Sequence, residues 1–387
     1  MIKNVLVILF SFLGIFAFSM EDDRVIGSIS ISGLKRTSES VIYNLLEVKE
    51  GDRFSKFNEE CFKQELLKTG ILRPGKISYN QNEDKVDINI LIHEKWTLLP
   101  VPIVSISGEN QYYGFVLLEQ NFLGLRKLLF IQSAYSTMTG LSGGIMYRDM
   151  DILPGDLFLL LGGFLSNNSD ESYLHTTGFI GVGKEFTKLK IQNQIKYENF
   201  LFDNFEQNQF ICNPINFMYT DLFYTSAMQT GTKVSMTMTP GWDIEELVMF
   251  LKLNNSFSYS KEIFRNLYLS GRLSSQFLDS PTLLEEYWGG SDNSRTLVPV
   301  LSDQYTGGSV LLEYAFLDFG AAVVTLMVSY EIGGYQHNND NWNIYTGPGA
   351  GLRLYLKKIA MPAVGFNVAY NTIDNNFLFS VAMGMSR

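Results

Sequence analysis

The residues with the clearest potential for specific chemistry are charged groups near the C-terminal end of the chain. Arg295 follows two glycines and a polar spacer in the segment GGSDNSRTL, residues 289–297. In the segments after it, apolar residues alternate with polar positions that include Glu313, Glu331 and Arg353, the pattern of strands with one apolar face. An arginine that reached a carboxylate on the polar face could form a two-pronged, charge-assisted hydrogen bond.

The residue types needed for catalysis or metal binding are sparse and scattered. His93 ends a predicted strand, whereas His175 and His337 fall in separate polar segments that we interpret as loops, and none has a catalytic partner at recognisable spacing. Cys61 and Cys212 lie in different predicted domains, and we interpret both as small buried apolar residues rather than as a disulfide. We therefore expect no enzyme active site, no metal site and no cofactor.

The first residues predict export from the cytoplasm. Lys3 precedes an apolar run from Val5 to Phe18, which is followed by small residues. This order describes a secretory signal peptide, expected over residues 1–20, with an uncleaved anchor as the alternative. After residue 20 no uninterrupted apolar stretch approaches the roughly 20 residues that a spanning helix needs. Any membrane insertion of the mature chain must therefore use strands.

Composition separates this chain from soluble enzymes and from nucleic-acid-binding proteins. It contains 29 Phe, 20 Tyr and 33 Gly, and only 18% of its residues are charged. An aromatic-rich, charge-poor sequence is typical of a barrel in the outer membrane. The formal net charge of −10 argues against a nucleic-acid partner, which a basic surface would favour.

Residues 21–95 predict a small α+β module. VIGSISI alternates like a half-buried strand, and SESVIYNLLEV has helical spacing with Ser38 available as its N-cap. FNEECFKQELLKTG predicts a second helix, after which Gly70 is suited to the cap. KISYN and KVDINILIH then predict two strands. The apolar stripe of the second helix is expected to consist of Phe57, Cys61, Phe62, Leu66 and Leu67.

Residues 96–387 predict an antiparallel transmembrane β-barrel. Segments of two-residue alternation recur between polar breaks such as SNNSDES, FDNFEQNQ and GYQHNNDNWN. At roughly 18 residues per strand and connection, this length gives a barrel of about 16 strands. A soluble β-sandwich or propeller is the alternative, which the signal peptide and the aromatic content disfavour.

The parity of the last strands places their charged residues in the lumen. In SVLLEYAF the residues Val310, Leu312 and Tyr314 form the apolar, lipid-facing side, so Glu313 points inward. The same argument puts Glu331 and Arg353 on the inner wall. We therefore expect both signs of charge inside this part of the barrel.

This order of parts resembles the BamA-type outer-membrane assembly superfamily, in which a POTRA module precedes a C-terminal surface-antigen barrel. TamA, the two-partner secretion transporters and the organellar import barrels are relatives. ISGLKRTSESVI and EGDRFS resemble parts of a POTRA module, and GPGAGLRLYL resembles the glycine-rich segment before the last strands. LLEQNFLG resembles the early-barrel motif, here Asn121, Phe122, Leu123 and Gly124. The resemblance implies a divergent member with a single POTRA module.

The resemblance also gives the arginine segment a role. In the family, a long surface loop folds back into the barrel and carries a glycine pair, a polar spacer and a Val-Arg-Gly-aromatic motif. It implies that Gly289, Gly290 and Arg295 tether such a loop in the lumen, with Glu313 or Glu331 as the partner of the arginine. A solvated surface loop without a specific partner is the alternative.

Three features depart from the family pattern. Arg295 is flanked by Ser294, Thr296 and Leu297, without the usual apolar residue before it and glycine and aromatic residue after it. Glu331 stands where the family commonly has aspartate, and the chain ends in AMGMSR rather than in an aromatic residue. These departures weaken the transfer of a specific activity more than that of the fold.

The resemblance implies an outer-membrane protein with a periplasmic module that captures polypeptide. Strand addition at an exposed sheet edge is a sequence-tolerant way to hold an extended chain. The barrel would then insert barrel proteins into the bilayer or pass secreted polypeptides across it, with periplasmic chaperones or accessory lipoproteins as further partners. The alternative function is a passive channel or surface antigen.

Overall fold

The computed structural model describes residues 24–82, 84–107, 110–153, 157–168, 172–225, 228–279, 282–289, 294–320, 322–338, 340–356, 361–373 and 375–383. The signal peptide predicted at residues 1–20 lies outside these ranges. The described chain forms two compact units. One contains the residues up to Thr97 together with Leu123–Arg126, and the other contains the rest. No helix within the described ranges has the length and apolarity needed to cross a bilayer.

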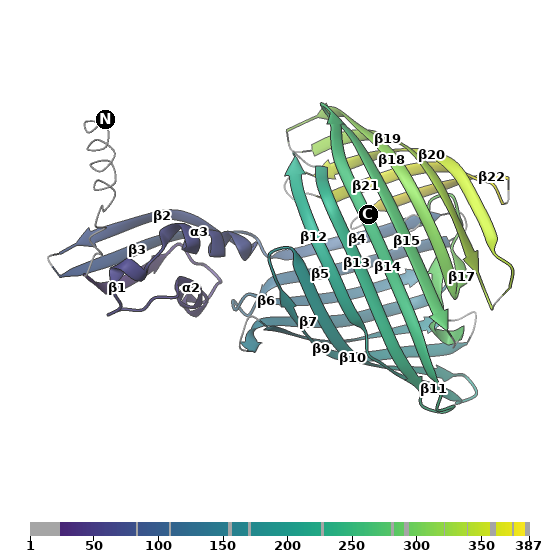
Figure 1. The fold of residues 1–387 in the computed structure, drawn as a ribbon, viewed down its shortest axis with the longest axis horizontal. Coiled ribbons are helices and arrows are strands. Elements are labelled where there is room, and N and C mark those ends of the chain that lie inside the picture. Colours follow the sequence, from purple (N-terminus) through teal and green to yellow (C-terminus); the bar gives the residue numbers. More distant parts are fainter. Residues whose placement is uncertain are drawn as a thin grey trace, which may run out of the picture. The chain divides into compact units, whose positions relative to one another are not determined.

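The first unit is a three-stranded sheet covered by two helices (Figure 1). In the sheet β3 is central, with β1 parallel to it on one side and β2 antiparallel to it on the other. The elements are β1 (Val25–Ser32), α2 (Glu39–Leu46), η1 (Phe54–Lys56), α3 (Glu59–Lys68), β2 (Leu72–Gln81) and β3 (Lys85–Glu94). The order of strand, helix, helix, strand and strand agrees with the sequence-based prediction.

Local signals explain where the two helices begin. The Ser38 hydroxyl accepts a hydrogen bond from the Ser40 backbone N–H, and the Asn58 side chain accepts one from the Cys61 N–H, so each helix has a side-chain N-cap. One core forms between the helices and the sheet. Its fully buried members include Ile26, Ile42, Leu66, Ile88, Ile90 and Ile92.

One expectation for the second helix is wrong. Cys61 is exposed instead of buried, and Leu67 is 47% exposed. Phe62 and Leu66, four residues apart, point into the core. Because α3 packs along this single row, the residues that flank it in sequence turn outward, and the buried stripe is narrower than the apolar pattern predicted.

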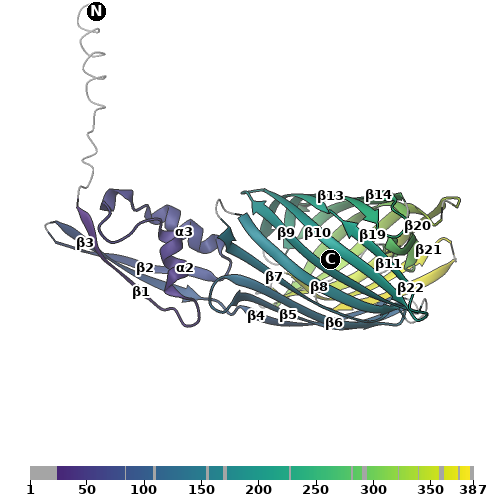
Figure 2. The same ribbon diagram turned by 90° about the horizontal axis from the view of Figure 1, so that it is seen from below.

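The second unit is a closed antiparallel barrel of tilted strands (Figures 1 and 2). Seventeen strand segments close the ring, of which β11 and β12 both pair with β10 and β13 and so form one interrupted strand, giving 16. The first ten segments are β4 (Leu98–Ser107), β5 (Asn110–Phe122), β6 (Lys127–Ser136), β7 (Gly140–Leu153), β8 (Leu157–Asn168), β9 (Tyr173–Glu185), β10 (Leu189–Phe202), β11 (Gln207–Cys212), β12 (Ile215–Thr225) and β13 (Met228–Asp243). The others are β14 (Met249–Phe264), β15 (Leu267–Asp279), β18 (Gln304–Asp318), β19 (Ala322–Gln336), β20 (Asn343–Leu356), β21 (Met361–Asn371) and β22 (Asn376–Met383).

The two faces of the wall follow the predicted alternation. Val310 is 56% exposed and Tyr314 is 47% exposed on the outside, whereas Glu313 between them is 2% exposed. Tyr330 and Ile332 likewise point outward on either side of the buried Glu331. An apolar exterior over a polar interior is the organisation of a barrel that spans a membrane.

The ring closes between the last strand and the first. Among the described residues, β22 pairs with β4 at Ser380–Met383 opposite Val104–Ser107. On another part of the wall, β18 and β19 pair along almost their whole lengths, from Gln304 opposite Gln336 to Asp318 opposite Val323.

Candidate functional site: a loop anchored to the inner wall

The segment between β15 and β18 contains its own small hairpin. It is described over residues 282–289 and 294–303 and contains η2 (Thr282–Leu284), β16 (Glu286–Trp288) and β17 (Val300–Ser302). The two short strands pair with each other. Gly289 has a φ of +112°, and a Cβ there would lie 2.5 Å from the Val298 carbonyl oxygen, so this turn requires glycine. Gly290 lies outside the described residues.

The loop meets the wall at the carboxylate of Glu331 on β19. Arg295 Nη1 lies 3.1 Å from Glu331 Oε1. The other oxygen, Oε2, accepts hydrogen bonds from the Ser294 hydroxyl at 2.9 Å and from the Thr296 backbone N–H and hydroxyl, both at 3.2 Å. Glu331 is 2% exposed. Three consecutive loop residues therefore supply one cation and three neutral donors to a single buried carboxylate.

The arginine contact differs in form from the expected two-pronged pair. Arg295 reaches Glu331 through one nitrogen because Ser294 and Thr296 occupy the second oxygen. Both residues are among those that depart from the family motif around Arg295. Their hydroxyl groups therefore help to hold the loop on the Glu331 carboxylate, which the motif pattern did not suggest.

Glu313, the other candidate partner of Arg295, is occupied by the wall itself. Its Oε2 lies 3.3 Å from Arg353 Nη1, and its Oε1 accepts hydrogen bonds from the Tyr355 hydroxyl at 2.9 Å and from Thr325. The structure thus brings together two separate charge pairs, Arg295 with Glu331 and Arg353 with Glu313. Of the two alternatives predicted for Arg295, only Glu331 is its partner.

An aromatic contact holds the hairpin beside this carboxylate. The Trp288 indole N–H donates to the Tyr345 hydroxyl at 2.9 Å, and the Trp288 ring stacks on Tyr305 with centroids 4.0 Å apart. A Cβ at Gly307 would come within 2.8 Å of both Trp288 and the Tyr345 hydroxyl, and Gly333 lies against the Tyr345 ring. The wall glycines in β18 and β19 therefore provide the space that the loop occupies.

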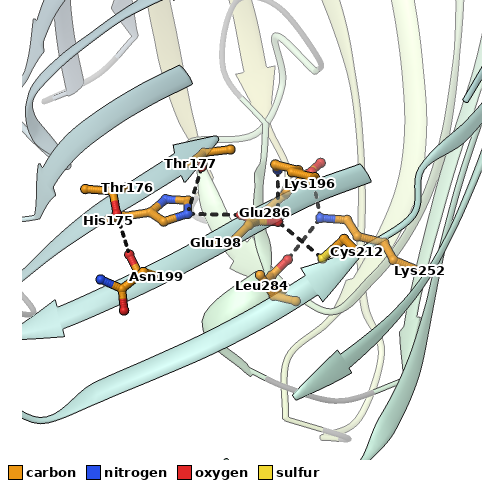
Figure 3. Close-up of polar contacts among 10 residues, drawn as sticks. All are labelled: His175, Thr176, Thr177, Lys196, Glu198, Asn199, Cys212, Lys252, Leu284 and Glu286. Carbon is orange, nitrogen blue, oxygen red and sulfur yellow. Dashed lines mark hydrogen bonds and ion pairs between the residues drawn. The ribbon is translucent and has the colours of Figure 1, made fainter. Parts of the chain in front are cut away.

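The first limb of the loop has an anchor of its own (Figure 3). Lys252 on β14 lies 2.6 Å from the Glu286 carboxylate and donates to the Leu284 carbonyl at 2.9 Å. The Leu284 side chain packs in a cluster with Phe200, Phe210 and Phe250 from the wall. No sequence signal indicates this anchor, because Lys252 is one of several lysines that lie in strands.

His175 is not in a solvated loop as expected, but in β9 on the inner wall. Its Nε2 lies 3.0 Å from Glu198, which also pairs with Lys196 at 2.9 Å (Figure 3). The His175 ring stacks on Phe200 with centroids 4.1 Å apart. Strand β9 begins at Tyr173, so the polar run before it is shorter than its composition suggested.

These groups are not arranged as a nucleophile and its base. The Cys212 thiol, buried as predicted, contacts Glu198 at 3.6 Å, and Glu198 stands between it and His175. Among the described residues, no group of three or more His, Cys, Asp or Glu side chains could hold a metal ion. His337 pairs with Glu285 of the loop, Nδ1 to Oε2 at 2.7 Å.

The early-barrel motif forms the turn between β5 and β6. Asn121 is 1% exposed, and its backbone N–H donates to the Glu119 carboxylate at 2.8 Å. Phe122 ends the strand opposite Lys127. Leu123 and Gly124 both have positive φ, as two consecutive residues in a tight turn can. The motif therefore belongs to a connection in the wall rather than to the loop site.

Comparison with known proteins identifies the module and the fold of the barrel. Residues 25–95 match the POTRA family, described as a surface antigen variable number repeat. The crystal structure of BamA from Haemophilus ducreyi lacking POTRA domains 1-3 is 12% identical, with a TM-score of 0.63, and the match covers 93% of this chain and 84% of that one. A search of curated proteins found no match to the sequence.

Two further solved structures have the same fold. CdiB from Acinetobacter baumannii is 12% identical with a TM-score of 0.63, over 94% of this chain and 74% of that chain. CdiB from Escherichia coli is 12% identical with a TM-score of 0.60, over 94% of this chain and 76% of that chain. With its apolar exterior, the barrel has the surface of one that spans a membrane. The described chain thus has the same architecture as these solved structures, a POTRA module followed by a 16-stranded barrel.

Proposed function

We propose that this protein captures extended polypeptides in the periplasm and moves them into or across the outer membrane. The observation that carries the proposal is in the POTRA module, where one edge of the sheet is closed and the other is open. An open edge binds a chain through main-chain hydrogen bonds and is tolerant of its sequence. Unfolded outer-membrane barrels or secreted polypeptides are the clients that need such tolerance.

The β1 edge is closed by the chain that follows α2. The Ile26 N–H donates to the Asp52 carbonyl, and the Ile26 carbonyl accepts from the Gly51 N–H, both at 2.8 Å. Further along, the Ile29 N–H donates to the Glu50 carboxylate at 3.1 Å. These contacts satisfy the groups that an added strand would use, so β1 is a poor site for a client.

The β2 edge is open over its second half. Within the described part of the module, residues 76–80 form backbone hydrogen bonds with no segment other than β3. Lys76 and Asn80 are exposed on this strand. A client segment can therefore add to the sheet alongside β2.

Site-specific photo-cross-linking tests which edge binds. A photoreactive residue replaces Asn80 on β2 or, as the matched control, Ser30 on β1; both positions are exposed. The protein is placed in liposomes with an unfolded outer-membrane barrel, and the folding rate of that barrel is followed in parallel. We expect cross-links from position 80, few from position 30, and faster folding than in empty liposomes.

Other outcomes would redirect the proposal. Cross-links at position 80 without faster folding would favour secretion of polypeptides over their insertion. Equal cross-linking at both positions would show that the open edge is not the binding site. If the client neither cross-links nor folds faster, the capture function is wrong, and steady conductance in a planar bilayer would then point to a passive channel.

A further inference from the structure

A cavity of about 510 Å³ lies along the inner wall, away from the Glu331 carboxylate that anchors the loop. It is formed by residues of β8, β9, β10, β12 and β13, including Phe164, Thr177, Gln192 and Gln194. Its volume is within the range of about 300–1,000 Å³ that ligand pockets occupy. Lys196, which pairs with Glu198 beside His175, also lines this cavity. The other residues of the loop site described above do not line it.

The lining of this cavity is neutral and rich in hydrogen-bonding groups. The side-chain amides of Gln192 and Gln194 form no hydrogen bond with any other described residue, so their donors and acceptors are available. Asn216 is held by Thr237 through a 2.7 Å hydrogen bond. The one cation, Lys196, is paired with Glu198 at 2.9 Å, so the surface carries no uncompensated charge.

A neighbouring cavity of about 130 Å³ adds further hydrogen-bonding groups and one cation. Thr237 lines both cavities, and the second is bordered by Asn254, Arg272 and Ser274 from β14 and β15 and by the stacked rings of Trp288 from the loop and Tyr305 from β18. Asn254 Oδ1 and Ser274 Oγ are buried and have no hydrogen-bond partner among the described residues. Buried polar atoms without partners are costly, so these two atoms point independently to a ligand that supplies donors.

We propose that these two cavities form a track that binds the main chain of an extended, uncharged polypeptide segment as it moves through the lumen. The inference rests on the proposed function, since the module would supply such a chain. Side-chain amides carry the same donors and acceptors as a peptide group and can pair with any sequence. The neutral lining of the larger cavity also avoids holding acidic or basic segments too tightly.

The aromatic residues of the cavity favour a peptide over a neutral sugar. A sugar is usually bound on a free aromatic face, but Phe164 lies against Gly144 and stacks on Phe179, with centroids 5.9 Å apart. Phe179 in turn lies within 2.6 Å of where a Gly162 Cβ would be. Both rings are thus engaged in packing within the wall, and the amides are left as the binding groups.

Thiol protection in the full-length protein tests the track. In a Cys61→Ser background the remaining Cys212 is 1% exposed and will not react. Gln194→Cys is compared with Gln132→Cys, an inner-wall position on β6 that lines neither cavity. Each variant is folded in lipid nanodiscs and treated with a small neutral thiol reagent. The probe is a 20-residue peptide of Ser, Asn and Gly.

We expect the peptide to protect position 194 and not position 132. At about ten times its dissociation constant the peptide should slow modification of the thiol in Gln194→Cys roughly tenfold, because protection rises as one plus that ratio. Raising the salt from about 0.05 to 0.5 M should change the protection less than about twofold, since the cavity around Gln194 carries no uncompensated charge. Gln192→Cys serves as a second track position if Gln194→Cys folds poorly.

Three outcomes would overturn the track. Equal protection at positions 194 and 132 would indicate nonspecific occlusion of the lumen. Protection by a neutral maltooligosaccharide but not by the peptide would assign the cavity to a sugar. No protection, while cross-links at position 80 and faster client folding persist, would reject the track and leave the proposed function intact; loss of all three readouts would reject both.

Discussion

The inner wall of the barrel has two regions of different chemistry. Along β18, β19 and β20 it carries buried charges and glycines, and every charge there has a partner, as in Glu331 with Arg295 and Glu313 with Arg353. Along β8 to β13, amides and hydroxyls surround an unfilled volume beside the paired Lys196 and Glu198. Strong pairs suit a permanent contact within one chain, whereas weak neutral groups suit a partner that must leave. The first region anchors the loop, and the second has the chemistry that the proposed track requires.

The largest effect should come from breaking the anchor. Glu331→Leu leaves Arg295 buried without its carboxylate, which should lower the free energy of unfolding by about 3–5 kcal/mol. Urea unfolding of the barrel in phospholipid vesicles, followed by tryptophan fluorescence, measures this. The matched change in the neutral region, Gln192→Leu, should cost less than about 0.5 kcal/mol.

A double variant checks the physical reason. Because the cost comes from an uncompensated charge, adding Arg295→Leu to Glu331→Leu should recover most of the lost stability. Equal stability losses for Glu331→Leu and Gln192→Leu would remove the distinction between the two regions.

A smaller effect should follow from filling the space that the wall glycines provide. Gly333→Ala places a methyl group against the Tyr345 hydroxyl and should cost about 1–3 kcal/mol through overpacking. Tyr345→Phe removes that hydroxyl, so the double variant should be more stable than Gly333→Ala alone. The rescue is partial because Tyr345 Cζ and the Thr306 carbonyl oxygen would still lie 2.6 and 2.8 Å from the added methyl group, and because Trp288 loses its acceptor. Thermal unfolding of the wild type, the two single variants and the double variant tests the rescue. A double variant no more stable than Gly333→Ala would show that the hydroxyl is not the main source of the clash.

The smallest effect should appear at a carboxylate that is held without a cation. In the module, Glu94 accepts hydrogen bonds from the Thr37 N–H at 2.7 Å and the Arg36 N–H at 3.0 Å. Partial burial opposes ionisation, but these hydrogen bonds prevail and lower the pKa of Glu94 below its ordinary value. Glu94→Gln should therefore cost about 1–2 kcal/mol at pH 7, less than removal of Glu331.

The stability that Glu94 contributes should depend on pH in one direction. A lowered folded-state pKa contributes stability above the ordinary pKa of about 4.3, and that stability is lost as the pH falls through the folded value. The gap between wild type and Glu94→Gln, measured by hydrogen exchange of the Thr37 amide, should therefore narrow below about pH 4. A gap that stays constant with pH would show that the side chain acts by packing alone.

The sequence predicts the fold well because strand parity and helix caps are local signals. Alternation alone places Glu313, Glu331 and Arg353 on the inner wall. It cannot choose between the two glutamates as the partner of Arg295, because both face the lumen and the choice depends on which wall residues already occupy them. Tyr355 and Thr325 occupy Glu313, and nothing in their spacing indicates it.

Features that depend on tertiary packing are not predicted by local sequence patterns, because they depend on residues that are distant in the chain. The polar neighbours of His175 suggest a loop, yet polar residues are normal on the lumen side of a strand. The apolar pattern predicts Cys61 in the core, but α3 buries only the row through Phe62 and Leu66. The Lys252 anchor joins residues more than 30 positions apart, beyond any periodic signal.

The loop between β15 and β18 has a mechanical consequence. It is fastened to Lys252 on β14 at one end and to Glu331 on β19 at the other, so it braces the arc of strands between them from within. Elastic strain imposed on the barrel is therefore taken up mainly by strands outside this stiffened arc.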